Sequence, residues 1–276
     1  MKKEKILDIS VIIPVHSLEP ENTFEFLQKA IESVEKQKNK IKGILLVVTN
    51  EVLKHPRFDE IKHTIADKNI VYVVNEGETD FCSQINFGVS KCHSKYFSIL
   101  ELDDEYSNIY FENVEKYMNA YPNISAFLPV SILVDTENRA LQYVNEAVWA
   151  QGFGEQLGQL DMTALLQYDN FIICGGVFTK ESFEEVGGLK PNIKLYFNYE
   201  FLLRYVNSDF NTMVIPKLGY KHLVDRDGSL FKSYKDPVSG ITPDEARFYL
   251  GAAKKEYFFN PNEIPRDIRY SPMSVV

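Results

Sequence analysis

The sequence predicts an α/β protein built on an open, mostly parallel, twisted sheet with flanking helices and a helical extension at the C-terminus. Short β-branched runs recur along the first hundred residues, and segments with apolar residues at helical spacing separate them. The composition, 45% hydrophobic and 25% charged among 276 residues, is typical of a folded globular protein. Together these observations favour an α/β fold over an all-helical or all-strand one.

The first hundred residues alternate predicted strands and helices. Four β-branched runs are expected to be strands: residues 10–15, 44–48, 70–74 and 96–100. A helix is expected between the first two strands, where Asn22 and Glu25 form a candidate capping box, and another around Ile85, before the fourth strand. Such strand–helix–strand units give a parallel sheet, whose ligands bind outside the carboxyl ends of the strands.

The middle of the chain predicts a mixture of strands and helices. Ser107 is expected to cap a helix that Pro122 closes, and residues 124–134 and 140–144 flank a polar turn as two paired strands. The next expected elements are a helix from Thr179 to Gly187, a helix around Phe201–Tyr205 and a short strand at Thr212–Ile215.

The C-terminal segment carries the clearest helix signal of the chain. Thr242, Pro243 and Glu245 supply an N-cap, a proline in the first turn and a capping box. After Asn260 the tail is expected to be extended.

Charge, hydropathy and cysteine usage exclude several classes. The net charge of −9 and pI of about 5.2 disfavour nonspecific electrostatic binding to nucleic acid. Apolar stretches fall short of the roughly 20 residues a membrane span needs, and the N-terminus shows no signal-peptide cleavage site, so we expect a cytoplasmic protein. The three cysteines show no CxxC spacing, which argues against a disulfide framework and a structural zinc site.

The acidic run after the fourth expected strand is the most informative feature. Residues 101–105 hold four carboxylates in five positions, and like charges repel unless a cation gathers them. Oxygen ligands suit Mg²⁺ or Mn²⁺, although a solvated acidic turn would have the same composition. The loop after the first strand lacks glycine, which argues against dinucleotide-binding and P-loop proteins.

In order and spacing, three segments resemble the family-2 glycosyltransferases of the GT-A fold: SVIIPVHS, CSQINFGVSKCHSKYFSILELDDEY and CGGVFTKESFEEVGGL. The resemblance covers roughly residues 8–230. It implies a GT-A glycosyltransferase-like domain at 1–230, with a nucleotide-binding half at about 1–106 and an acceptor half at about 107–230. Residues 231–276 are then a C-terminal helix and extended tail.

The resemblance implies a metal-dependent transfer, with inversion, from a nucleotide-diphosphate sugar to an acceptor hydroxyl. Glu101, Leu102 and Asp103 fall on the family's DxD motif, which holds a Mn²⁺ or Mg²⁺ ion against the donor phosphates. Asp103 would be the main ligand, with Glu101 reaching the ribose or the metal through water. His222 matches a residue that closes over the diphosphate or the metal. Positions expected to face the base and ribose are Pro14, His16, Thr49, Asn50, Asn86 and Gly88, with Thr49 departing from the usual Asp.

The catalytic base departs from the family pattern. Inverting members carry a Glu-Asp pair at the start of a helix, and here Phe197 and Asn198 occupy those positions. Asn198 cannot accept a proton, so the resemblance leaves Glu200, Asp225 and Asp227 as candidates, with Glu200 the first choice. A general base typically contributes about 10² to 10⁴-fold, so its loss would slow transfer without abolishing it.

Two other functions stay open from the sequence. One is a sugar-nucleotide-binding or scaffold protein on the same fold that has lost catalysis with the Glu-Asp pair. The other is nucleotidyl transfer, which the missing glycine-rich loop disfavours. The acceptor is open among a glycan, a lipid-linked sugar, a protein and a hydroxymethylated DNA base, and the chain could form a homo-oligomer.

Overall fold

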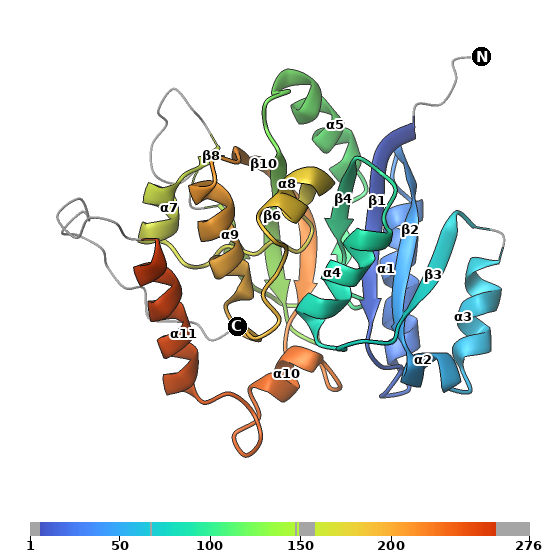
Figure 1. Ribbon diagram of the computed structural model, residues 1–276. Helices are drawn as coiled ribbons and strands as arrows, with labels where there is room; N and C mark the ends of the chain where they lie inside the picture. Colours follow the sequence, from blue (N-terminus) through green and yellow to red (C-terminus); the bar gives the residue numbers. More distant parts are fainter. Residues whose placement is uncertain (1–5, 67, 147, 149–157, 258–276) are drawn as a thin grey trace, which may run out of the picture.

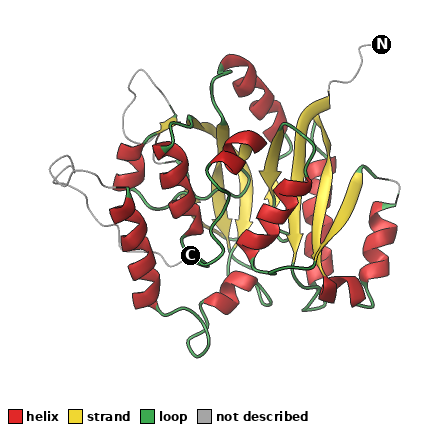
Figure 2. Ribbon diagram, in the orientation of Figure 1, coloured by secondary structure: helices red, strands yellow, loops and turns green. Residues whose placement is uncertain are grey.

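The computed structural model describes residues 6–66, 68–146, 148 and 158–257, which fold around a single mixed sheet with helices on both faces (Figures 1 and 2). The strand order is β3-β2-β1-β4-β9-β6-β10-β5, with β7 paired to β6 and β8 paired to β10. The strands are β1 (Ile6–Val15), β2 (Lys40–Thr49), β3 (Ile70–Asn75), β4 (Tyr96–Ile99), β5 (Glu105–Tyr106), β6 (Ala126–Val134), β7 (Ala140–Val144), β8 (Gln159–Leu160), β9 (Val177–Thr179) and β10 (Thr212–Leu223).

The helices include those expected from the sequence and several shorter ones. They are α1 (Thr23–Glu35), α2 (Asn50–Lys54), α3 (Phe58–Ile65), α4 (Phe81–Lys91), α5 (Tyr110–Ala120), α7 (Met162–Gln167), α8 (Lys180–Glu185), α9 (Phe197–Asn207), α10 (Leu230–Tyr234) and α11 (Pro243–Glu256). In Figure 1, α1 and α5 lie behind the sheet, whereas α4, α8 and α9 lie in front of it. No helix within the described ranges is long and apolar enough to cross a membrane.

The N-terminal half confirms the predicted parallel sheet. β3, β2, β1 and β4 pair in parallel. Helices cover both faces of this part of the sheet, as is usual for parallel strands, and the β-branched runs of β1 and β2 are therefore buried. α4 packs closely on this sheet at Gly88, where a Cβ would lie 2.7 Å from Ile12 Cγ2 and 2.8 Å from Val47 Cγ2. The parallel strands therefore all end at the same edge, the lower one in Figure 1.

The other half of the sheet is mixed. β6 and β10 are parallel, whereas β9 runs antiparallel to both β4 and β6 and joins the two halves. β10 extends well beyond the expected Thr212–Ile215 and reaches Leu223. Its register with β6 shifts between Ile215 and Leu218, around Pro216, which has no N–H to donate to the ladder. This irregularity lets the strand continue and brings its C-terminal residues to the carboxyl edge.

The helix caps agree with the sequence only in part. Thr242 Oγ1 accepts the Glu245 N–H at 3.2 Å and caps α11 as predicted. The expected capping box of α1 does not form, since Asn22 has helical φ and ψ and its side chain caps nothing. The Ser107 hydroxyl also caps no helix, because α5 begins later, after Ile109. The expected extended tail after Asn260 lies outside the described residues.

Candidate functional site

The acidic run forms a tight turn at the carboxyl end of β4. The Asp104 N–H donates to the Glu101 carbonyl at 3.1 Å, and the Leu100 N–H donates to the Ile12 carbonyl at 3.0 Å, which ties the turn to β1. Glu101 and Asp104 are both buried, and Asp104 is fully so. The turn therefore places carboxylates inside the protein at the edge where ligands bind to such sheets.

His222, at the end of β10, lies against these carboxylates. Its Nδ1 is 2.7 Å from Asp104 Oδ2 and 3.7 Å from Glu101 Oε1, and the Leu223 N–H donates to Asp104 Oδ1 at 2.8 Å. The antiparallel pairing of β10 with β5 fixes this approach, with Lys221 opposite Glu105. The structure thus joins residues 118 positions apart in the chain into one cluster, Glu101, Asp104 and His222.

The electrostatics of the cluster follow from burial and proximity. Burial raises the pKa of Glu101, and the charge of His222 opposes this rise only in part. For His222, burial lowers the pKa, but the Asp104 and Glu101 carboxylates outweigh it and raise the pKa well above its ordinary value. A buried imidazolium therefore partly compensates the carboxylates of the turn.

Asp103, the expected main ligand, has a different partner. Its Oδ2 accepts a hydrogen bond from Arg226 Nε at 2.6 Å, and both side chains are nearly buried. Burial and the neighbouring Asp104 raise the pKa of Asp103, while Arg226 lowers it. Asp104, absent from the ligand set expected from sequence, takes the place next to His222. The signal for Asp104 was present, since it belongs to the same run of four carboxylates.

The cluster fits a divalent cation. The described chain offers one ligand atom from each of Glu101, Asp104 and His222, all within 4.8 Å of one another. Two carboxylates with one neutral imidazole suit Mn²⁺, and the predominance of oxygen also suits Mg²⁺. A bound ion would displace the proton of the His222 imidazolium and take over its compensation of the carboxylates. Asp103 would join them only after leaving Arg226.

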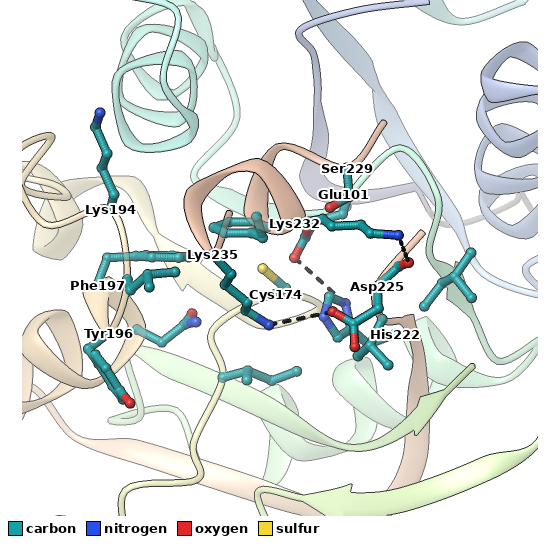
Figure 3. Close-up of a pocket in the computed structure, with 16 residues that line it drawn as sticks. Glu101, Cys174, Lys194, Tyr196, Phe197, His222, Asp225, Ser229, Lys232 and Lys235 are labelled. Atoms are coloured by element: carbon teal, nitrogen blue, oxygen red, sulfur yellow. Dashed lines mark hydrogen bonds and ion pairs between the residues drawn. The ribbon is translucent and has the colours of Figure 1, made fainter. Parts of the chain in front are cut away.

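A cavity of about 110 Å³ opens over this cluster (Figure 3). Its floor holds Glu101 and His222, and Asn198 at the start of α9 lines another wall. Three lysines also line it: Lys194, Lys232 and Lys235. The combination of a carboxylate–imidazole floor with lysines on the walls suits a ligand that carries phosphate groups, with or without a metal ion.

Comparison with known proteins agrees with this geometry. Residues 10–263 match the family described as "Glycosyltransferase like family 2", a span that includes α10 and α11. The chain belongs to this family. No curated protein sequence matches it.

Solved structures confirm the GT-A fold of this family-2 glycosyltransferase-like chain. S. aureus TarS residues 1–349 in complex with UDP-GlcNAc is similar with a TM-score of 0.66 and 10% identity, over 90% of this chain and 66% of that one. The complex of the same fragment with UDP gives a TM-score of 0.59 and 11% identity, over 82% of this chain and 62% of that one. The structure of TarS 1–349 without a named ligand gives a TM-score of 0.59 and 10% identity, over 78% of this chain and 60% of that one. The chain thus spans about two thirds or less of the fragments it resembles.

Four of the expected donor-binding residues gather beside the cluster. Pro14, His16, Leu102 and Asp103 line a second, smaller cavity of about 20 Å³, together with Arg226. Burial lowers the pKa of His16, which favours its neutral imidazole. These residues come from the ends of β1 and β4, as the resemblance implies.

The other expected donor-binding residues have structural partners. Thr49 caps α2, its Oγ1 accepting the Val52 N–H at 3.2 Å, and Asn50 is exposed in the first turn. The Asn86 amide pairs with the Leu189 backbone through two hydrogen bonds of 2.7 and 2.8 Å, and Gly88 is the contact point of α4 with the sheet. Neither Asn86 nor Gly88 lines the two cavities.

The expected base Glu200 is tied into a buried ion-pair network. It is 1% exposed, accepts two hydrogen bonds of 2.9 Å from Arg204, and lies 2.8 Å from Lys190 Nζ. Burial raises the pKa of Glu200, but these hydrogen bonds outweigh it and hold the pKa below its ordinary value. Glu200 is absent from the lining of the cavity over the cluster, whereas Asn198 lines it and accepts the Ile173 N–H at 3.0 Å.

The two remaining base candidates follow β10. Asp225 lines the cavity, has a φ of 56°, and its carboxylate is 66% exposed at 3.7 Å from Lys235 Nζ (Figure 3). Asp227 is exposed outside the cavity lining, where a hydrogen bond from Lys232 lowers its pKa. Of the three candidates, the structure places only Asp225 on the cavity.

Proposed function

We propose that this chain transfers a sugar from a nucleotide-diphosphate donor to an acceptor hydroxyl group. Family membership supports transferase activity in general. The observation that carries the proposal is the cluster of Glu101, Asp104 and His222, of which Glu101 and His222 line the cavity that Asn198 and Asp225 also line. This arrangement combines a place for the donor phosphates with a place for an acceptor.

A divalent ion is part of the proposal, with Glu101, Asp104 and His222 as the residues that hold it. Such an ion would stabilise the negative charge that develops on the departing diphosphate. The protein's own cations support the same step, because Lys194, Lys232 and Lys235 line the cavity where that charge develops.

Asp225 is the base that the geometry supports best. Its carboxylate on the cavity wall is 66% exposed, with only the longer 3.7 Å ion pair to Lys235, and can accept the proton of an acceptor hydroxyl, whereas the buried carboxylate of Glu200 is held by Arg204 and Lys190. Direct attack of the activated hydroxyl on the anomeric carbon would invert its configuration.

A second candidate function is donor binding without turnover. It is favoured by the amide of Asn198, which stands at the family's base position and hydrogen-bonds to the Ile173 N–H. In this case the chain would serve as a sugar-nucleotide-binding or scaffold protein.

Thermal-shift screening of the purified protein against nucleotide-diphosphate sugars, each with Mn²⁺ and with a chelator, tests donor binding. UDP-GlcNAc is the first donor of the panel, because a similar structure contains it. Binding to the native state stabilises it by about 2.7 kcal/mol at a hundredfold excess over Kd. A larger shift with Mn²⁺ than with chelator supports the metal-assisted site, and no shift with any donor contradicts the proposal.

Asp225→Asn separates the two candidate functions. Asparagine tolerates positive φ, so the backbone is retained while the proton acceptor is lost. We expect unchanged donor binding and a rate of donor turnover about 10² to 10⁴-fold lower. Asp227→Asn, two residues away and outside the cavity lining, is the matched control. Absence of turnover in the unmodified protein with a broad acceptor panel would favour the binding or scaffold function.

A further inference from the structure

The segment after β10 covers the predicted donor site. We call Val224–Tyr234 the cover segment; it crosses the carboxyl edge of the sheet and ends in α10, at the bottom of Figure 1. Gly228 has a φ of 75°, and a Cβ there would overlap Pro20. The segment is therefore packed directly on the loop that follows β1.

Arg226 fixes the cover segment to the acidic turn. Its side chain is 3% exposed, and its Nε donates to Asp103 Oδ2 at 2.6 Å. Its Nη1 donates to Thr23 Oγ1 at 3.1 Å and to the Asp227 carbonyl at 2.9 Å, and its guanidinium lies over the Phe26 ring at 5.4 Å. The carboxylate that the family motif assigns to a metal ion is thus already paired with a cation of the chain itself.

Phe231 fixes the other end of the cover segment. Its ring stacks on Phe197 at 5.7 Å between centroids and contacts Phe81 at 5.2 Å. These contacts join α10 to the first residues of both α9 and α4. Phe231 therefore packs on the first residues of both helices that frame the donor site.

The space left under the cover segment is too small for the proposed donor. The two cavities that Glu101 lines measure about 110 and 20 Å³, and a larger one, of about 510 Å³, opens on the α1 side of Asp103, away from Glu101. Pockets that take ligands of drug size measure about 300–1,000 Å³, and a nucleotide-diphosphate sugar is a ligand of at least drug size. Either Phe231 or the Arg226–Asp103 pair must move before such a donor can bind.

We propose that the cover segment is autoinhibitory, and that Arg226 holds it closed by competing with a divalent cation for Asp103. Opening breaks the Arg226–Asp103 pair and adds the Asp103 carboxylate to the cluster of Glu101, Asp104 and His222. The inference deepens the proposed function and rests on it for the identity of the donor. The competition for Asp103 itself involves only the chain and a cation.

If Arg226 competes with a cation for Asp103, the affinity of the protein for Mn²⁺ and for UDP should rise when the cover segment is loosened. When only a fraction of the protein is open, the apparent Kd is the intrinsic Kd divided by that fraction. Breaking a charge-assisted hydrogen bond is worth roughly tenfold or more in an equilibrium constant. Removing Arg226 should therefore tighten the binding of Mn²⁺ alone by about tenfold.

The test measures binding of Mn²⁺ alone, and of UDP in the presence of Mn²⁺, by titration calorimetry with the full chain. Arg226→Met removes the competing cation, and Phe231→Ala loosens the cover without touching Asp103. Arg57→Met is the matched control, since Arg57 also pairs with a carboxylate, Glu60, and lies over a phenylalanine ring. Melting temperatures of all variants establish that each is folded.

Tighter Mn²⁺ binding by Arg226→Met and tighter UDP binding by Phe231→Ala, with Arg57→Met unchanged, are the expected results. If Arg226→Met does not fold, the Phe231→Ala arm decides alone. Unchanged or weaker binding in the folded variants overturns the inference, because Arg226 and Phe231 then do not oppose ligand binding. Failure of the proposed function looks different: UDP and the donor panel then bind to no variant, whereas the Mn²⁺ titrations still report on the competition.

Discussion

Replacing Glu200 with glutamine distinguishes a structural ion pair from a catalytic base. The carboxylate of Glu200 is buried with two cationic partners, Arg204, which is 13% exposed, and Lys190, which is 37% exposed. Breaking a fully buried pair costs about 3–5 kcal/mol. Glutamine keeps one hydrogen-bond acceptor and Lys190 is partly solvated, so we expect the free energy of unfolding to fall by about 2 kcal/mol. For a chain of this size that lowers the melting temperature by about 4–8 °C.

The difference in stability between the wild type and Glu200→Gln should depend on pH in a defined direction. The pKa of Glu200 is lowered in the folded state, so its charge stabilises the protein above the unfolded pKa of about 4.3. This contribution is lost as the pH falls through the lower folded pKa. The gap in melting temperature between the wild type and Glu200→Gln should therefore be full at pH 7 and shrink below about pH 4.

Melting curves followed by circular dichroism at pH 7 and at acidic pH test this expectation. The matched control is Glu32→Gln, which removes an exposed Glu32–Lys36 pair within α1 and should change stability by about 0.5 kcal/mol or less. Equal losses in the two variants would refute the reasoning. A Glu200→Gln variant of unchanged stability that retains donor binding and loses turnover would assign the base to Glu200 instead of Asp225.

Three further outcomes are expected. Asp104→Asn removes a charge from the cluster, so the extra thermal shift that Mn²⁺ gives a donor should disappear, whereas the exposed loop variant Asp227→Asn should retain it. Gly88→Val would overlap Ile12 and Val47, and urea unfolding should show a loss of about 1–3 kcal/mol, unlike Gly251→Val, where a Cβ would meet no described atom beyond the backbone of its own helix. Thr242→Ala removes the N-cap of α11, so amide exchange in that helix should quicken about fivefold, equivalent to about 1 kcal/mol.

Local patterns predicted most of the secondary structure. The β-branched runs that became β1 and β2 are buried on both faces, and such strands appear in a sequence as nearly continuous hydrophobic runs. The signals at caps were less reliable, as Asn22 and Ser107 illustrate. A side chain caps a helix only when the backbone around it takes the right conformation, and packing decides that conformation.

The candidate site was predictable in part. The four carboxylates of residues 101–105 and their position after a buried strand indicated a charged site at the carboxyl edge. Which carboxylate meets which cation was not readable, because the turn after β4 directs Asp103 toward Arg226 and Asp104 toward His222. Adjacent residues in a turn point in different directions, and no sequence period describes them.

The sequence by itself determined the parallel N-terminal sheet, the α11 helix and the acidic turn, since each depends on residues within one short segment. Only the tertiary structure decided the partners of that turn. Arg226 and His222 come from 123 and 118 residues further along the chain, and the irregular register of β10 on β6 brings them to the turn. Glu200 pairs locally, with Arg204 one turn further along α9, and it was the packing of that helix in the fold that kept Glu200 out of the cavity lining. Side-chain pairing at such distances depends on register and packing, which the whole fold sets.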